Sequence, residues 1–371
     1  MLTSYLISLL NAPLELGANK LSTTLEQNFT AVPKKPWGIG RNQVLINLAV
    51  FLGCIVATPI LLNLTPLSGK LGGAAIFLIL TTATNIMISV NRQGLRMISD
   101  ALSTSLIYIA TVLVLLPLGS ILFTVIQKGS AAIRWNTFTQ DMKFSSPDAP
   151  FTEGGALHAI VGTSIIVLIA TIVSVPIGIL TALYLTEIKG KFESLVRFLV
   201  QAMSGVPSIV AGLFIYSVLI VTLGARYSAF VGALALSILM LPTVARTAEE
   251  VLKLIPRDLR EAGTALGATQ WRTVAMVVVP AARSGIFTAI ILGIARVAGE
   301  TAPLLLTILG NTATNLNPFN EPSAALPLYT FTLMRTGLEV ALTRAWGGAL
   351  ILLTLVLILF ITARLLSGKK R

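Results

Sequence analysis

The sequence has few charged residues and many apolar ones. Only 11% of its 371 residues are Asp, Glu, Lys or Arg, 55% are hydrophobic, and the mean hydropathy is +0.86. Soluble domains carry about 25% charged residues, so this composition excludes a soluble globular protein. Several apolar runs reach the roughly 20 residues that a helix needs to cross a bilayer. The sequence therefore predicts an all-α polytopic membrane protein.

Cysteine and histidine each occur once, as Cys54 and His158. A single cysteine excludes an intramolecular disulfide. A metal site needs several ligands, and none surround His158 in the sequence. The sequence also lacks the Gly-x4-Gly-Lys-Ser/Thr loop that cradles nucleotide phosphates. We therefore expect no metal and no cofactor bound by this chain, and no nucleotide hydrolysis by it.

Positive charge is distributed unevenly along the chain, whose formal net charge is +12. The apolar runs predict membrane spans near 44–64, 72–90, 105–126, 157–186, 198–222, 229–245, 285–309 and 346–363. When alternate loops are assigned to one side together with the N-terminus, that side holds most of the Lys and Arg residues, which is the bias of cytoplasmic loops. An even number of spans then puts both termini in the cytoplasm. The charge thus indicates topology rather than nucleic-acid binding.

The pattern divides the chain into an N-terminal part and a core of six spans. The parts are a cytoplasmic N-terminal segment, an extra transmembrane hairpin, a basic cytoplasmic loop, the core and a basic cytoplasmic tail, at residues 1–43, 44–90, 91–104, 105–366 and 367–371. The short connection 65–70 predicts that the two hairpin helices are antiparallel neighbours. Residues 324–334 are apolar but too few to span, so we expect a re-entrant or interfacial helix there.

The largest inner loop, 246–283, contains a polar segment that favours a short amphipathic helix. Leu259, Ala262 and Leu266 share one helical face. Gly263 and Gly267 lie four residues apart and leave a shallow strip where another surface can approach. The helix either docks on a partner or lies on the membrane as an ordinary amphipathic helix. The candidate docking residues are Arg257, Asp258, Leu259, Glu261, Ala262, Gly263, Leu266 and Gly267.

A second polar group lies inside the predicted span 285–309. Arg296 and Glu300 are four residues apart, so on a continuous helix they can form an ion pair. A buried charge in a span is costly and usually faces a polar cavity. Two roles remain open: a pair that fixes helix packing, or a substrate pathway that includes Arg296, Glu300 and Thr301. Pro303 is expected to loosen the helix beside these residues by leaving the carbonyl of Gly299 without its donor.

Two further prolines lie inside predicted spans. Pro176 belongs to the span 157–186, and Pro207 to the span 198–222. A proline inside a helix removes one backbone hydrogen bond, and the freed carbonyl must find another partner within the bilayer. We therefore predict helix kinks at Pro176, Pro207 and Pro303.

Several of these segments resemble known permeases. Residues 261–280 resemble the EAA loop of ABC-importer permeases, which docks into the ATPase subunit. Gly263 stands where that family has a third Ala, and Val-Val-Val-Pro replaces Ile-x-Leu-Pro. The segment Arg296–Leu305, Arg-Val-Ala-Gly-Glu-Thr-Ala-Pro-Leu-Leu, resembles the hallmark of phosphate-importer permeases, and the order of motifs is most similar to the PstA type. Other similar segments are Gly154–Thr163, Ser204–Val210 and Leu241-Pro242. The resemblance covers roughly 95–365 and leaves out the hairpin.

The resemblance implies a six-helix ABC-importer permease core (MetI/type I-like) at 105–366, in a bacterial plasma (inner) membrane. It implies a homologous PstC-type permease, a PstB-type ATPase dimer that carries ATP and Mg, a PstS-type phosphate-binding protein, and contact with membrane lipid. The chain would form half of a phosphate pathway, with Arg296 meeting phosphate oxygens, and would not be an enzyme. Two alternatives stay open: an importer of sulfate, molybdate or phosphonate, because arginine binds any oxyanion, and an ion-coupled secondary transporter.

Overall fold

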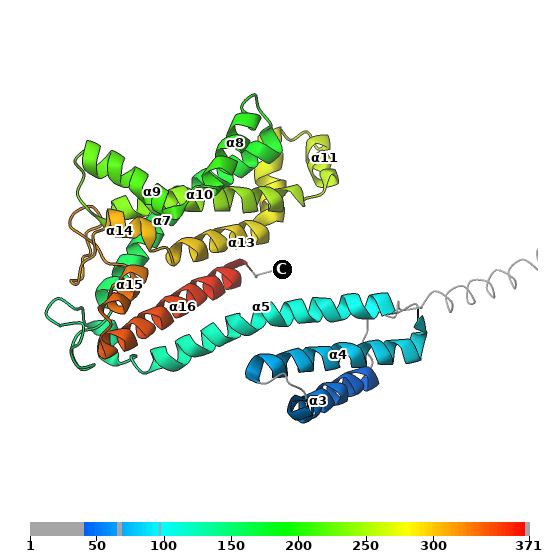
Figure 1. Cartoon of the computed structure of the whole chain (residues 1–371). Coiled ribbons are helices and arrows are strands. Elements are labelled where there is room, and N and C mark those ends of the chain that lie inside the picture. Colours follow the sequence, from blue (N-terminus) through cyan, green and yellow to red (C-terminus); the bar gives the residue numbers. More distant parts are fainter. Residues whose placement is uncertain (1–40, 65–68, 96–97, 368–371) are drawn as a thin grey trace, which may run out of the picture. The chain divides into compact units, whose positions relative to one another are not determined.

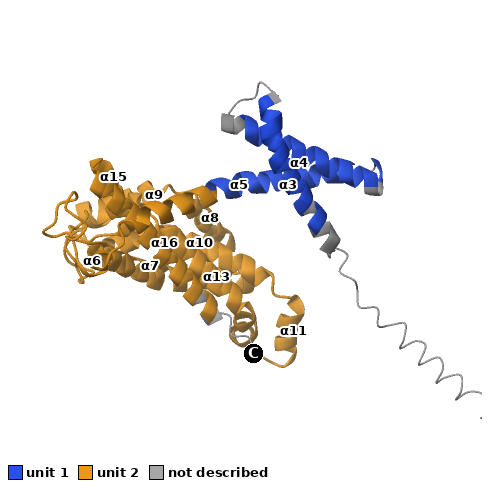
Figure 2. Ribbon diagram, turned by 90° about the horizontal axis from the view of Figure 1, so that it is seen from below, with its two compact units in different colours: residues 1–117 blue, residues 118–371 orange. Residues whose placement is uncertain are grey.

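The computed structural model describes residues 41–64, 69–95 and 98–367. Within these ranges the regular elements are helices, and the only strand-like pairing is a parallel bridge between Leu309 and Ser323. Six of the described helices are long and apolar enough to cross a membrane, or seven if one bent pair counts as a span. The expected all-α polytopic class is confirmed. The chain separates into two compact units, residues 1–117 and 118–371 (Figure 2).

The first unit contains a pair of packed helices. Its elements are α3, α4 and the beginning of α5, at Arg41–Leu64, Gly69–Gln93 and Ile98–Ser130. Phe51 of α3 meets Phe77 of α4 edge-to-face, with ring centroids 5.7 Å apart. The sulfur of Cys54 lies 3.9 Å from the hydroxyl oxygen of Thr84. The two predicted hairpin helices therefore pack on each other, and Cys54 is a small buried residue in their contact.

The second unit is a bundle arranged around one central helix, α10 (Ala229–Lys253), which packs most extensively on α7 and α13 (Figure 1). The elements before α10 are the end of α5, α6 (Trp135–Thr139), α7 (Leu157–Leu183), the π-helical turn η2 (Tyr184–Ile188), α8 (Glu193–Ser204), α9 (Ser208–Ile215) and the π-helical turn η3 (Tyr216–Thr222). Those after α10 are α11 (Arg257–Ala265), α12 (Gln270–Thr273), the π-helical turn η4 (Val274–Val278), α13 (Val279–Ala298), α14 (Ala302–Thr307), α15 (Leu326–Thr336) and α16 (Glu339–Ser367).

Small residues allow the neighbours of α10 to approach it closely. A Cβ on Gly178 of α7 would lie 3.0 Å from the side chain of Val244, and one on Gly293 of α13 would lie 2.7 Å from it. Helices in membranes pack through such small residues because lipid provides no hydrophobic drive between them. Val244 is fully buried, so α10 forms the core from which the other helices are positioned.

Two of the predicted spans are wrong as continuous helices, because each is broken in the structure. The predicted span 198–222 consists of α8 and α9, which meet at a bend of 105°. Pro207, the residue before α9, has no N–H to continue a helix. The predicted span 285–309 ends as α13 at Ala298, and the chain resumes as α14 at Ala302. Hydropathy did not reveal these breaks because the residues on both sides are apolar.

The predicted re-entrant or interfacial segment 324–334 forms the short helix α15. Its first residues are buried, and the backbone N–H of Leu326 donates to the Thr163 hydroxyl over 2.7 Å. A Cβ on Gly162 would lie only 2.0 Å from the Ala324 carbonyl oxygen. Gly162 and Thr163 of α7 therefore form a seat for the beginning of α15, which gives part of the Gly154–Thr163 motif a structural role.

Candidate functional site

The polar loop contains the short helix that the sequence predicts. This helix, α11, begins directly after Pro256, and Asp258 lies in its first turn, where a carboxylate complements the helix dipole. Leu259 is 41% exposed and Leu266 is 89% exposed. Both side chains are apolar and lie uncovered by the described part of the chain. The helix thus presents an apolar surface with acidic and basic neighbours, which is the composition of a docking surface.

One ion pair ties α11 to the end of α7. The Arg260 guanidinium donates to both carboxylate oxygens of Glu187 at 2.8–3.2 Å, and also to the carbonyls of Leu252 and Ile255. The hydrogen bonds to Glu187 raise the pKa of Arg260 above its ordinary value. Glu187 lies in η2, and its side chain is only 6% exposed. A displacement of α11 therefore pulls on α7 and α10 through a two-pronged contact.

The two glycines of the loop do not form the expected strip. Gly263 faces inward, and a Cβ there would lie 2.7 Å from the Thr273 methyl carbon. Gly267 has φ +80° and ends α11, with its N–H donating to the Thr264 carbonyl and the Ala268 N–H donating to the Gly263 carbonyl. This pattern is a Schellman cap, in which glycine is favoured by its left-handed backbone. Both glycines therefore shape the helix.

Arg296 and Glu300 form no ion pair within the described chain, so the predicted pairing is wrong. The reason is the end of α13: Gly299 caps the helix, and Glu300 lies beyond it, off the i, i+4 face. Arg296 is exposed on this chain and instead donates from Nη1 to the Thr243 hydroxyl of α10 over 3.3 Å. Among the residues that the structure describes, the other donors of the guanidinium have no hydrogen-bond partner.

After the break that follows α13, α14 packs closely on α9. Thr301 precedes α14, and Pro303 lies in its first turn rather than within a longer helix. A Cβ on Gly212 of α9 would lie 2.5 Å from Pro303 Cα. The predicted kinks at Pro207 and Pro303 are therefore helix breaks, whereas Pro176 lies inside the uninterrupted α7. Glu300 and Thr301 belong to the non-helical link at the end of α13.

The sequence analysis did not identify Arg246 of α10, a second arginine near the Thr243 residue that Arg296 contacts. Arg246 is exposed and lies three residues after Thr243, the residue that Arg296 contacts. Residues three apart are neighbours on a helix surface, so Arg246 and Thr243 share a face. The predicted span 229–245 ends one residue before Arg246, so Arg246 was assigned to the following loop. Its position next to an apolar run was the signal that could have identified it.

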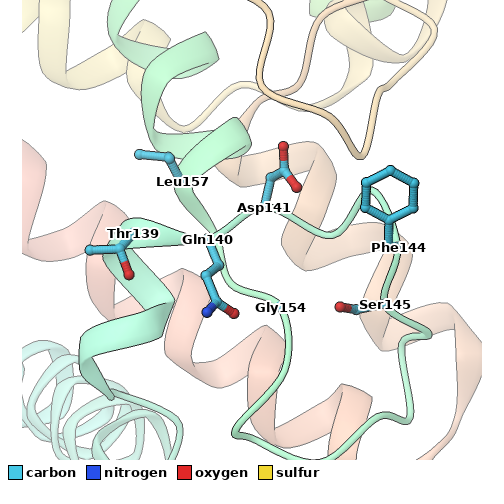
Figure 3. A pocket seen from close by; sticks show the side chains of 7 residues that line it. All are labelled: Thr139, Gln140, Asp141, Phe144, Ser145, Gly154 and Leu157. Carbon is cyan, nitrogen blue, oxygen red and sulfur yellow. The ribbon is translucent and has the colours of Figure 1, made fainter.

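Asp141 helps to hold two loops together, alongside a backbone hydrogen bond from the Met142 N–H to the Thr312 carbonyl. Asp141 Oδ2 accepts from the backbone N–H and the hydroxyl of Thr314, at 3.0 and 3.3 Å. Desolvation works to raise the pKa of Asp141, but these bonds and one from the Lys143 N–H lower it overall. Figure 3 shows Asp141 at a cavity of about 350 Å³ that Phe144 and Gly154 also line. The bonds connect the loop before α7 to the loop after α14.

The single histidine is a packing residue at the beginning of α7. His158 is 3% exposed, and its ring meets the Tyr329 ring edge-to-face at 5.4 Å. Burial raises the pKa of Tyr329 to about 12. The contact joins α7 to α15 beside the seat formed by Gly162 and Thr163.

Comparison with known proteins places this arrangement in a family. Residues 174–371 match the family described as the binding-protein-dependent transport system inner membrane component. The phosphate transport system permease protein PstA 1 of Mycobacterium tuberculosis is 40% identical over 263 residues, which cover 70% of this chain and 86% of that protein in strain CDC 1551. The PstA of Haemophilus influenzae is 40% identical over 74% of this chain and 96% of its own length.

The chain belongs to the binding-protein-dependent transport system inner membrane component family. As such a component it is a multi-pass inner-membrane protein that takes part in transport and is not an enzyme. Its family works together with an ATPase and a substrate-binding protein. Among solved structures, an inward-facing MetNI methionine ABC transporter aligns with 56% of this permease and 89% of its own chain, at 19% identity and a TM-score of 0.46.

Proposed function

We propose that this chain is a permease subunit of an ATP-driven phosphate importer and forms half of its translocation pathway. The PstA proteins named above are phosphate transport permeases, and they match most of this chain at 40% identity. In that assembly a homologous PstC-type permease lies alongside, a PstB-type ATPase dimer binds ATP and Mg, and a PstS-type protein delivers phosphate. Both termini lie in the cytoplasm, as the distribution of Lys and Arg favours.

The observation that carries the proposal is the unpaired guanidinium of Arg296. A charged side chain within a span costs about 2.5–3.5 kcal/mol on insertion scales and usually faces a polar cavity. Within the described chain Arg296 has only the Thr243 hydroxyl as a hydrogen-bond partner. Its remaining donors form a planar fork that suits two phosphate oxygens. Glu300 and Thr301, in the link after α13, complete the proposed pathway residues on this chain.

Coupling to the ATPase runs through α11. Its exposed residues Leu259, Ala262 and Leu266 form the contact, while Arg257, Asp258 and Glu261 border it. ATP binding closes the ATPase dimer and moves α11. The pair between Arg260 and Glu187 then carries the movement to η2 and α7. The anion pathway alternates between its outward- and inward-facing states as the two permeases move.

The test is phosphate uptake and ATP hydrolysis in proteoliposomes that contain the complete transporter. Arg296→Lys keeps the charge but loses the planar fork, so we expect an assembled complex that hydrolyses ATP and loses most of its uptake. Arg283→Lys is the matched control, because Arg283 lies near the opposite end of α13, over the Phe287 ring at 5.6 Å. It should transport as the wild type does.

Three outcomes would count against the proposal. Normal uptake by Arg296→Gln would remove Arg296 from the pathway. Loss of complex assembly in the same variant would assign Arg296 to packing. Uptake of sulfate, molybdate or phosphonate in preference to phosphate would keep the permease architecture but change its substrate, which arginine chemistry alone permits.

A further inference from the structure

A polar cavity of about 730 Å³ lies behind α11, between this helix and the turn that joins η2 to α8. Five cationic and three acidic side chains line it. Most of these charges are already paired. Arg260 holds Glu187, and Arg197 holds Glu193 together with Glu249. The cavity therefore differs from the proposed docking contact, where Leu259, Ala262 and Leu266 are exposed.

Two cations at the cavity have no ion-pair partner in the described part of the chain. Neither Lys189 nor Arg257 forms an ion pair with any described residue. Lys189 precedes α8 and has φ +49°, and Arg257 is the first residue of α11. The N-terminus of a helix adds partial positive charge to that of the side chain. Glu261 is the one lining carboxylate without an ion pair in the described chain, so the unpaired charges leave an excess of positive charge.

A buried hydroxyl without a hydrogen-bond partner lies at the same cavity. Thr273 lines this cavity and is only 4% exposed. Its Oγ1 is buried and has no hydrogen-bond partner among the described residues. A buried hydroxyl without a partner costs free energy. A bound oxyanion would accept this hydrogen bond as well as those of the two cations.

We propose that this cavity binds a phosphate group, held by Arg257, Lys189 and the Thr273 hydroxyl. The site is separate from Arg296 and goes beyond the transport function. Two sources have this chemistry: free inorganic phosphate, and the phosphate of an anionic lipid headgroup at the inner leaflet. The volume accommodates a hydrated ion or a headgroup. An occupant would bridge α11 to the turn before α8, and would stiffen the coupling helix against the body of the permease.

The experiment follows the reactivity of a cysteine placed at the cavity. Thr264→Cys, in a Cys54→Ala background, puts a thiol on a residue that lines the cavity and is exposed. Ala265→Cys is the control, because it is exposed on the same helix but does not line the cavity. The full-length chain is placed in nanodiscs of neutral phosphatidylcholine, and maleimide labelling is timed with inorganic phosphate or chloride at equal ionic strength. A second set of nanodiscs contains phosphatidylglycerol and no phosphate.

If free phosphate is the occupant, it should slow labelling of Thr264→Cys several-fold in neutral nanodiscs and leave Ala265→Cys unchanged. If a headgroup is the occupant, phosphatidylglycerol should slow labelling without added phosphate. The double substitution Lys189→Gln and Arg257→Gln should abolish the protection, whereas Glu261→Gln should strengthen it. Arg272 is an exposed cation outside the cavity, so Arg272→Gln should leave the protection intact. Labelling that neither additive slows, or protection that survives the double substitution, overturns the proposal. The same labelling is measured on Arg296→Gln. Because the proposed site does not include Arg296, its protection should equal that of the parent protein whether or not Arg296 belongs to the pathway.

Discussion

Two glycines in the second unit mark places where one segment meets the backbone of another. A Cβ on Gly162 would lie 2.0 Å from the Ala324 carbonyl oxygen, and one on Gly212 would lie 2.5 Å from Pro303 Cα. Neither neighbour is a flexible side-chain end that can move aside. Both contacts hold elements that follow a break in the chain, α14 and the beginning of α15. These glycines thus fix the course of residues 299–326 against α7 and α9.

Gly263 offers a test at the scale of one residue. Gly263→Val should press against Thr273, where a Cβ would already lie 2.7 Å from the methyl carbon. Overpacking of this kind costs about 1–3 kcal/mol, and α11 should shift outward. We expect weaker retention of the ATPase in a pull-down and a lower Tm of the purified chain. Ala265→Val, exposed on the same helix, is the control. Full ATPase retention with an unchanged Tm would show that the inward packing of Gly263 is unimportant.

At the scale of helices, the sequence predicted where the helices lie along the chain better than where they are broken. Long apolar runs identify α7, α10 and α16 because burial in lipid or protein requires apolar side chains over a fixed length. The breaks before α9 and before α14 depend instead on which neighbour each helix packs against. The pairing of Arg296 with Glu300 failed for that reason, since it assumed an unbroken helix. The amphipathic helix α11 was predictable because its polar composition interrupts apolar runs, whereas the inward orientation of Gly263 requires knowledge of Thr273.

The ion pair between Arg260 and Glu187 predicts the consequence of disconnecting α11. Arg260→Gln leaves a carboxylate that is 6% exposed without its cation, and should cost about 2–3 kcal/mol, below the value for a wholly buried pair because Arg260 is 24% exposed. We expect ATP hydrolysis to continue while the phosphate moved per ATP falls. Arg272→Gln, an exposed arginine in the same loop, is the control. An unchanged ratio of phosphate to ATP would show that movement reaches the bundle by another route.

Asp141 predicts a pH dependence of the two loops that it connects, before α7 and after α14. Its pKa is lowered from 3.8 in the folded protein, so its bonds to Thr314 contribute stability that is complete above 3.8 and is lost as the pH falls through the lower folded value. Asp141→Asn should therefore increase hydrogen exchange of residues 310–322 at neutral pH, and wild type and variant should converge once the pH has fallen below the lowered pKa of Asp141. Asp148→Asn, exposed in the same loop, is the control. Equal exchange in both proteins at neutral pH would contradict this tether.

At the scale of the whole molecule, the family match and the compact units divide the chain in a related way. The match begins at residue 174 and extends to the end, and the second compact unit begins at residue 118. The packed pair α3 and α4 lies outside both. Its contacts, such as Phe51 on Phe77, are made between its own helices. The transport elements identified above, α11, α13 and the link before α14, all belong to the second unit.

We propose that the helical pair α3 and α4 is peripheral to transport. Deletion of residues 1–90 removes α3 and nearly all of α4, and leaves intact the second unit with its core around α10. Because no proposed pathway or coupling residue is removed, the shortened protein should still assemble with its partners and retain phosphate uptake. Uptake per assembled complex is measured in proteoliposomes, with membrane insertion checked separately, and Arg296→Gln in the shortened chain is the inactive reference. Normal insertion and assembly with complete loss of uptake would make the hairpin an integral part of the transporter.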